Sequence, residues 1–153
     1  MTEALQAQSS ARRDWLAVLA RAGTEALEAC YRQAAPWPPV QRVRAPEVGM
    51  VMLRGRVGGT GAPFNLGEAS LTRCAMRPAS GALGVGYVLG RDRRKAELVA
   101  LFDALLQDDA ARGRAMAQVV EPLRRQQEQQ RDAASRAAAS SRVDFFTMVR
   151  GEA

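Results

Sequence analysis

The stretch from residue 56 to residue 77 constrains the fold more than any other, because a glycine-rich loop there separates two runs that are typical of β-strands. Glycine adopts positive φ without strain and lets backbone N–H groups approach a bound group closely. The loop is therefore either a tight hairpin connection or a cradle for an oxyanion. It has neither the Gly-Lys-Ser/Thr ending of a P-loop nor a GxGxxG pattern opening a helix, so both nucleotide motifs are absent. Its glycines are Gly58, Gly59, Gly61 and Gly67.

Four segments have the alternating pattern of β-strands, at residues 40–48, 50–57, 69–75 and 81–90. Pro46 interrupts the first of them. Short connections between consecutive strands favour antiparallel pairing. The sequence therefore predicts an antiparallel sheet of about four strands.

The second and fourth segments also predict how the sheet is covered. In the second, Val51, Leu53 and Val57 alternate with more polar residues and predict one buried face. In the fourth, Gly84 and Gly86 leave one face almost without side chains, so a helix, a partner or a ligand must lie close to the backbone. We expect another subunit or a second copy of the chain to meet this glycine face.

Helical patterns lie on both sides of the strand region in the sequence. A first helix is predicted from Ser10 to Gly23, after a loose lead-in, and Thr24 is the expected cap of a short second helix. After the strands, Asp92 is the expected N-cap of a helix with a clear apolar stripe. A further helix is interrupted at Pro122 and continues as a polar segment.

The predicted fold class is α+β, with N-terminal helices, an antiparallel sheet and a long C-terminal helical region, as a single domain over residues 1–153. Residues 143–153 form an apolar hook after the polar helix, and we expect it to dock on another subunit or a second copy, or to fold back onto its own core. The expected partner-contact residues in this hook are Val143, Phe145, Phe146, Met148, Val149 and Arg150.

The composition excludes several kinds of chemistry. The chain has no histidine, which removes Ser/His, Cys/His and histidine–zinc mechanisms built from this chain alone. Its two cysteines, Cys30 and Cys74, lie far apart, so we expect free thiols and no metal site. No signal sequence or membrane span is visible, and a cytoplasmic location is expected.

The positive charge is mainly arginine and gives a net charge of +6. This charge favours an anionic partner, such as a nucleotide, a nucleic acid or an acidic protein surface, or it is simply a solvated surface. A non-enzymatic nucleic-acid-binding module is therefore the alternative function. Aromatic residues make up only 5% of the chain, which disfavours base stacking.

Three stretches together resemble one family: the glycine loop with FNLGEASLTR at 58–73, GYVLGRD with KAEL at 86–98, and SRVDFFTMVRG at 141–151. Their order and spacing resemble the PhnG subunit of the bacterial carbon-phosphorus lyase system. The resemblance implies an accessory subunit of a transferase complex with the H, I and J subunits, in contact with the I subunit above all. It implies that an alkylphosphonate displaces adenine from Mg-ATP to give α-D-ribose 1-alkylphosphonate 5-triphosphate.

In the family that the chain resembles, the nucleosidase step is attributed to the I subunit. The J subunit of that family's complex is an iron-sulfur radical enzyme. The resemblance therefore implies a chain that binds no cofactor and is inactive alone, and it assigns no catalytic residue here. From the residues themselves, Thr60 and the backbone of Gly58, Gly59 and Gly61 are candidates to contact a phosphate or phosphonate, with charge from Arg73 and Arg91. Glu68 and Asp92 are candidate polar organisers. The alternatives are a hairpin fixed by its own hydrogen bonds and an interface salt bridge.

Overall fold

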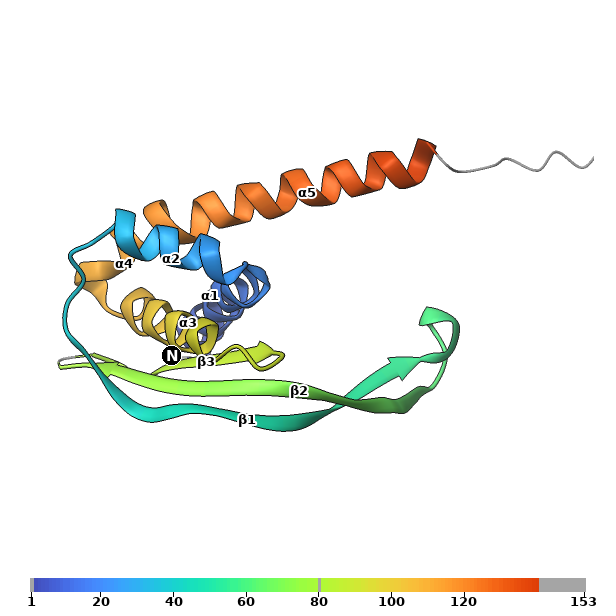
Figure 1. Ribbon diagram of the computed structural model, residues 1–153, viewed down its shortest axis with the longest axis horizontal. Coiled ribbons are helices and arrows are strands. Elements are labelled where there is room, and N and C mark those ends of the chain that lie inside the picture. Colours follow the sequence, from blue (N-terminus) through green and yellow to red (C-terminus); the bar gives the residue numbers. More distant parts are fainter. Residues whose placement is uncertain (1, 80, 141–153) are drawn as a thin grey trace, which may run out of the picture.

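The computed structural model describes residues 2–79 and 81–140 and shows helices stacked on one side of an antiparallel sheet (Figure 1). The strands are ordered β1-β2-β3, so β1 and β3 are the edges. This arrangement confirms the α+β class with N-terminal helices and a long C-terminal helix. The elements are α1 (Thr2–Arg21), α2 (Thr24–Gln33), β1 (Val40–Arg56), a 3₁₀ turn η1 (Val57–Gly59), β2 (Pro63–Pro78), β3 (Gly84–Leu89), α3 (Arg93–Leu106), α4 (Asp109–Ala115), a π-helical turn η2 (Met116–Val120) and α5 (Glu121–Ser140).

The sheet has three strands within the described residues, and not the predicted four or so. The segments expected at 40–48 and 50–57 are one continuous strand, β1. Pro46 does not break it, because the register with β2 shifts between Arg44 and Glu47. Proline cannot donate to a strand ladder, and an edge strand with an irregular register is where it is tolerated.

The glycine face of β3 is covered by α3 of the same chain, which confirms the prediction that a helix could lie close to the backbone there. The expectation that another subunit or a second copy meets this face is wrong. A Cβ on Gly84 would lie 2.1 Å from the carbonyl oxygen of Ala100, and a Cβ on Gly86 would lie 2.1 Å from that of Ala96. Ala96, Ala100 and Ala104 are one helical turn apart and fully buried. Small residues on both elements therefore let the helix backbone rest almost directly on the strand.

The opposite face of the sheet carries no helix in the part of the chain that the structure describes (Figure 1). Tyr87 and Leu89 are exposed on it. The buried face predicted for β1 is also wrong, because Leu53 and Val57 are exposed. Beyond the last β2–β3 pair, Leu71 and Leu89, the two long strands continue as a two-stranded ribbon past the helices. Residues 50–70 are called the hairpin arm from here on.

The helices differ from expectation mainly at their ends. The first begins at Thr2 and has no loose lead-in. The N-cap of the second helix is Gly23, and not Thr24 as predicted. The Thr24 hydroxyl donates instead to one oxygen of the Asp92 carboxylate. The other oxygen of Asp92 accepts the N–H of Lys95 at 2.8 Å, so Asp92 caps α3 as predicted. The π-helical turn directly before Pro122 accommodates the missing proline N–H, which explains the predicted interruption.

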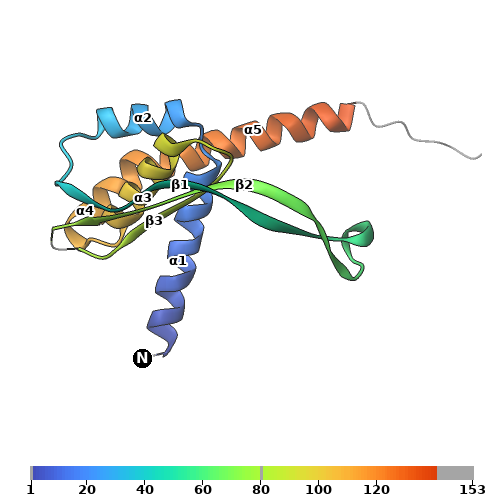
Figure 2. The same cartoon turned by 60° about the horizontal axis from the view of Figure 1, so that its bottom comes forward.

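Helix α5 leaves the body as a largely unsupported rod. Every residue from Glu128 to Ser140 is exposed, and the rod extends on the same side of the molecule as the hairpin arm (Figures 1 and 2). The side-chain amide of Gln127 ties it to the body by donating to the carbonyl of Val18 at 2.8 Å. The hairpin arm and α5 thus project from the body on the same side (Figures 1 and 2).

Replacing Gly84 with alanine tests the contact between β3 and α3. We expect Gly84→Ala to lower the free energy of unfolding by about 3 kcal/mol, because the new methyl group overlaps the backbone of α3. Gly49→Ala is the matched control in β1, where an added Cβ meets nothing within 4 Å, and it should change stability by less than about 0.5 kcal/mol. Urea unfolding followed by circular dichroism measures both, and equal stability of the two variants would contradict this packing.

Candidate functional site

The glycine loop lies at the tip of the hairpin arm and is held by its own hydrogen bonds. Gly58 and Gly59 have positive φ angles of 58° and 83°. The N–H groups of Thr60 and Gly61 both donate to the carbonyl of Val57, the second at 2.8 Å. The Arg56 guanidinium donates to the carbonyl of Gly61 at 3.0 Å. Two of the amides expected to cradle an oxyanion are therefore already engaged in forming the turn.

The structure does not bring the predicted phosphate contacts together. Arg73 lies ten residues along β2 from Pro63, which places it roughly 30 Å from the loop at the strand spacing of about 3.3 Å per residue. Its guanidinium pairs with Glu47 of β1 at 3.0 Å, so its anionic partner within the described residues is a carboxylate of this chain. Arg91 is exposed in the connection after β3. Glu68 lies in the hairpin arm opposite Met52.

The most constrained carboxylate is Asp103, which sequence reasoning did not single out. It is fully buried in α3 and accepts hydrogen bonds from two other elements, α1 and β3. Arg12 donates to both of its oxygens at 3.2 and 2.7 Å, the Trp15 indole N–H donates at 2.9 Å, and the backbone N–H of Val85 donates at 2.9 Å. Gln107 adds a contact at 3.3 Å. A buried carboxylate held by this many donors fastens the elements together.

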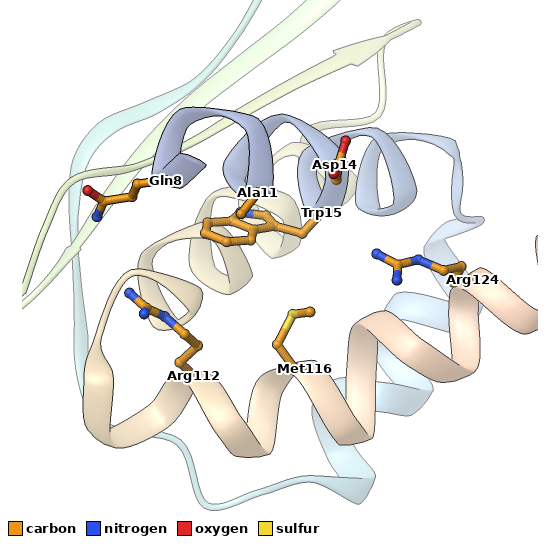
Figure 3. Close-up of a pocket in the computed structure, with 7 residues that line it drawn as sticks. All are labelled: Gln8, Ala11, Asp14, Trp15, Arg112, Met116 and Arg124. Atoms are coloured by element: carbon orange, nitrogen blue, oxygen red, sulfur yellow. The ribbon is translucent and has the colours of Figure 1, made fainter. Parts of the chain in front are cut away.

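A cavity of about 450 Å³ lies between α1 and the α4–η2–α5 segment (Figure 3). Trp15 and Met116 give it an apolar floor, and Arg112 and Arg124 lie at its sides (Figure 3). Both arginines already have partners, since Arg112 donates to the carbonyl of Leu106 at 2.8 Å and Arg124 to Glu121 at 3.0 Å. The lining offers apolar contact and charge, but no nucleophile and no carboxylate–base pair. Its residues are Gln8, Ala11, Asp14, Trp15, Arg112, Met116 and Arg124.

The cysteines and carboxylates do not assemble a metal site in the described part of the chain. No group of three or more histidine, cysteine, aspartate or glutamate side chains is placed to hold an ion there. Cys30 and Cys74 are free and buried, and burial raises the pKa of both thiols, which lowers their reactivity. Within residues 2–79 and 81–140, no helix has the length and apolar character needed to cross a membrane.

Comparison with known proteins identifies the family. A family model described as phosphonate metabolism protein PhnG matches residues 10–151. The chain belongs to the PhnG family. A relative from Rhizobium meliloti (strain 1021), named alpha-D-ribose 1-methylphosphonate 5-triphosphate synthase subunit PhnG, is 45% identical over 145 residues, which cover 92% of this chain and 90% of the relative. The resemblance drawn from the three sequence stretches is therefore confirmed.

Two apolar stretches of the chain lie apart from the groups described above. The hook at 143–153, with Val143, Phe145, Phe146, Met148, Val149 and Arg150, lies outside the described residues, so its docking stays a prediction. The exposed apolar surface of the hairpin arm was missed. The signal was present, because the MVML run at 50–53 is apolar on both faces of its strand, a pattern typical of strands that are covered on both sides.

Replacing Asp103 tests its structural role. We expect Asp103→Ala to destabilise the chain by about 3–5 kcal/mol, because it leaves a guanidinium, an indole N–H and a backbone N–H without their shared acceptor. Asp109→Ala is the control, since the side chain of Asp109 is 95% exposed, and it should shift stability by no more than about 0.5 kcal/mol. Chemical denaturation reports both values, and a mild effect at Asp103 would argue against a fastening role.

The N-cap of α3 predicts a specific pH dependence. The backbone N–H of Lys95 and, next, the hydroxyl of Thr24 lower the pKa of the Asp92 carboxyl. A lowered folded-state pKa stabilises the protein fully above the unfolded value of about 3.9, and this contribution is lost as pH falls through the folded value. Asp92→Asn keeps a cap but cannot ionise. We expect the stability advantage of the wild type at pH 7 to narrow below about pH 4. Unfolding curves that stay parallel from pH 7 to pH 3 would contradict this assignment.

Proposed function

We propose that this chain is an accessory subunit of a cytoplasmic carbon-phosphorus lyase complex, which supports displacement of adenine from Mg-ATP by an alkylphosphonate. The observation that carries the proposal is the relative named as a subunit of a ribose methylphosphonate triphosphate synthase, which aligns with nearly the whole of this chain. The partners proposed are the H, I and J subunits, with the I subunit as the direct contact.

The chemistry of this reaction supports an accessory role. A phosphonate oxygen forms a bond to C1′ of the ribose as the bond from C1′ to adenine breaks, and the departing adenine takes up a proton. General acid catalysis of such a step needs a titratable group beside the leaving group. The chain has no histidine, and its buried carboxylate, Asp103, is fully engaged. We therefore assign proton transfer to another subunit and assign assembly and support to this one.

The candidate phosphate contacts keep a narrower role in this proposal. The loop at 58–61 and Arg73 are too far apart to hold one phosphate, so each would complete a site built mainly by a neighbouring subunit. Thr60 and Arg91 are both exposed, so the hydroxyl of one and the guanidinium of the other could contact a phosphate bound at such a site. Mg-ATP is bound in this proposal as the substrate of the complex, and this chain alone holds no cofactor.

Adenine release tests the proposal directly. We expect the H, I and J subunits to release adenine from Mg-ATP and methylphosphonate only when this chain is present, with at least a tenfold loss of rate on its omission, while the chain alone releases none. Chromatography of free adenine is the measurement, and the same mixture without methylphosphonate is the control. Turnover by the isolated chain, or an unchanged rate without it, would overturn the accessory role.

A further inference from the structure

The exposed apolar residues of this protein gather on its sheet. Within residues 6–79 and 81–140, every exposed large apolar side chain belongs to the three strands or the turn between the first two. Monomeric proteins seldom expose so many such residues close together, and a concentration of this kind marks an interaction site. Six of them lie on the hairpin arm. They are Met50 (59% exposed), Met52 (47%), Leu53 (36%), Val57 (67%), Phe64 (42%) and Leu66 (65%).

The hairpin arm is also too thin to be stable without support. Its two strands pair with each other from Met50 and Ser70 outward to Arg56 and Pro63, and no third described strand joins them there. The consecutive residues Met52 and Leu53 are both exposed, so apolar side chains lie on both of its faces. Among the residues that the structure describes, no other strand pairs with either of its edges (Figure 2). A two-stranded ribbon alone is marginally stable in water, and covering it with protein supplies the missing packing.

The positive charge of β1 and β2 favours a partner with an acidic surface. Residues 40–78 contain six arginines and two glutamates, which gives a net charge of +4 out of +6 for the whole chain. The exposed guanidinium of Arg54 has no ion-pair or hydrogen-bond partner among the described residues. The arm itself, with Arg54, Arg56 and Glu68, has a net charge of +1, and the rest of the strand pair supplies the other +3. A second copy would bring two positive strand pairs together, which disfavours self-association through this sheet. A surface with apolar residues and carboxylates matches both properties.

We propose that the hairpin arm is the docking element for a different subunit of the complex, whose surface is apolar and bordered by carboxylates. This inference rests on the proposed function, because the proposed function is what requires that other subunit to exist. The methionines at positions 50 and 52 suit such a contact, because their flexible, polarizable side chains adapt to the surface they meet. The arginines orient the arm and speed its encounter with the acidic border.

Two kinds of arm variant test the docking. Met52→Thr combined with Leu66→Thr removes apolar surface while keeping residues suited to strands. Arg54→Glu reverses one charge, and Arg131→Glu on the exposed part of α5 is its control because the change in net charge is identical. Each variant is made in the full-length chain, and circular dichroism verifies that it folds. Its affinity for the purified H, I and J subunits is then measured by biolayer interferometry at several salt concentrations.

We expect the double threonine variant and Arg54→Glu each to raise Kd tenfold or more, with a weaker salt dependence for Arg54→Glu, while Arg131→Glu stays within twofold of wild type. Wild-type affinity in both arm variants would overturn the proposal. So would a wild-type dimer in light scattering that the arm variants dissociate, because the occupant would then be a second copy. Loss of binding to duplex or single-stranded DNA, with partner binding unchanged, would also overturn it.

The binding and adenine assays separate this proposal from the proposed function. If arm variants lose the partner while adenine release does not depend on this chain, docking stands and the accessory role fails. If adenine release depends on this chain but arm variants bind normally, the accessory role stands and docking by the arm fails.

Discussion

A single buried carboxylate fixes how the body of this protein is assembled. The Asp103 carboxylate, on α3, accepts hydrogen bonds from Arg12 and Trp15 of α1. It also accepts one from the backbone N–H of Val85 in β3. Because a buried charge without partners is costly, these elements must meet at one point for the chain to fold. The same point sets how α1 lies across α3, and so it also shapes the cavity beneath Trp15.

The close contact between α3 and β3 complements this polar anchor. Glycines on the strand and alanines on the helix bring the two backbones together, and the core is then completed on the helical side of the sheet. The packing uses only one face of the sheet and only the part of it near β3. The rest of the two long strands, and most of α5, extend from the body with little support of their own. This division between a self-sufficient body and dependent projections suits a subunit of a larger assembly.

Much of the body could be predicted from local sequence patterns. The N-cap at Asp92, the stripe of α3 and the interruption near Pro122 depend on residues that are neighbours in the chain, and all three are found. The pattern at Gly84 and Gly86 required a close neighbour, but alternation cannot say which element supplies it. Leu53 was assigned to a buried face because alternation assumes that one face has a core to meet. The candidate phosphate contacts do not come together, because the glycine loop and Arg73 lie far apart along the same long strand. The length of that strand depends on its pairing with β1, which local patterns do not reveal.

The hairpin arm has a consequence for the life of the protein before it reaches its partners. An unpaired strand edge that carries apolar side chains is a template on which strands of other molecules can add, and Pro46 and the register shifts near it protect only the inner end of β1. A cell that makes this chain in excess would accumulate orphan molecules prone to coalesce or to be degraded. Synthesis of this chain together with its partners would shorten the time for which the arm stays uncovered.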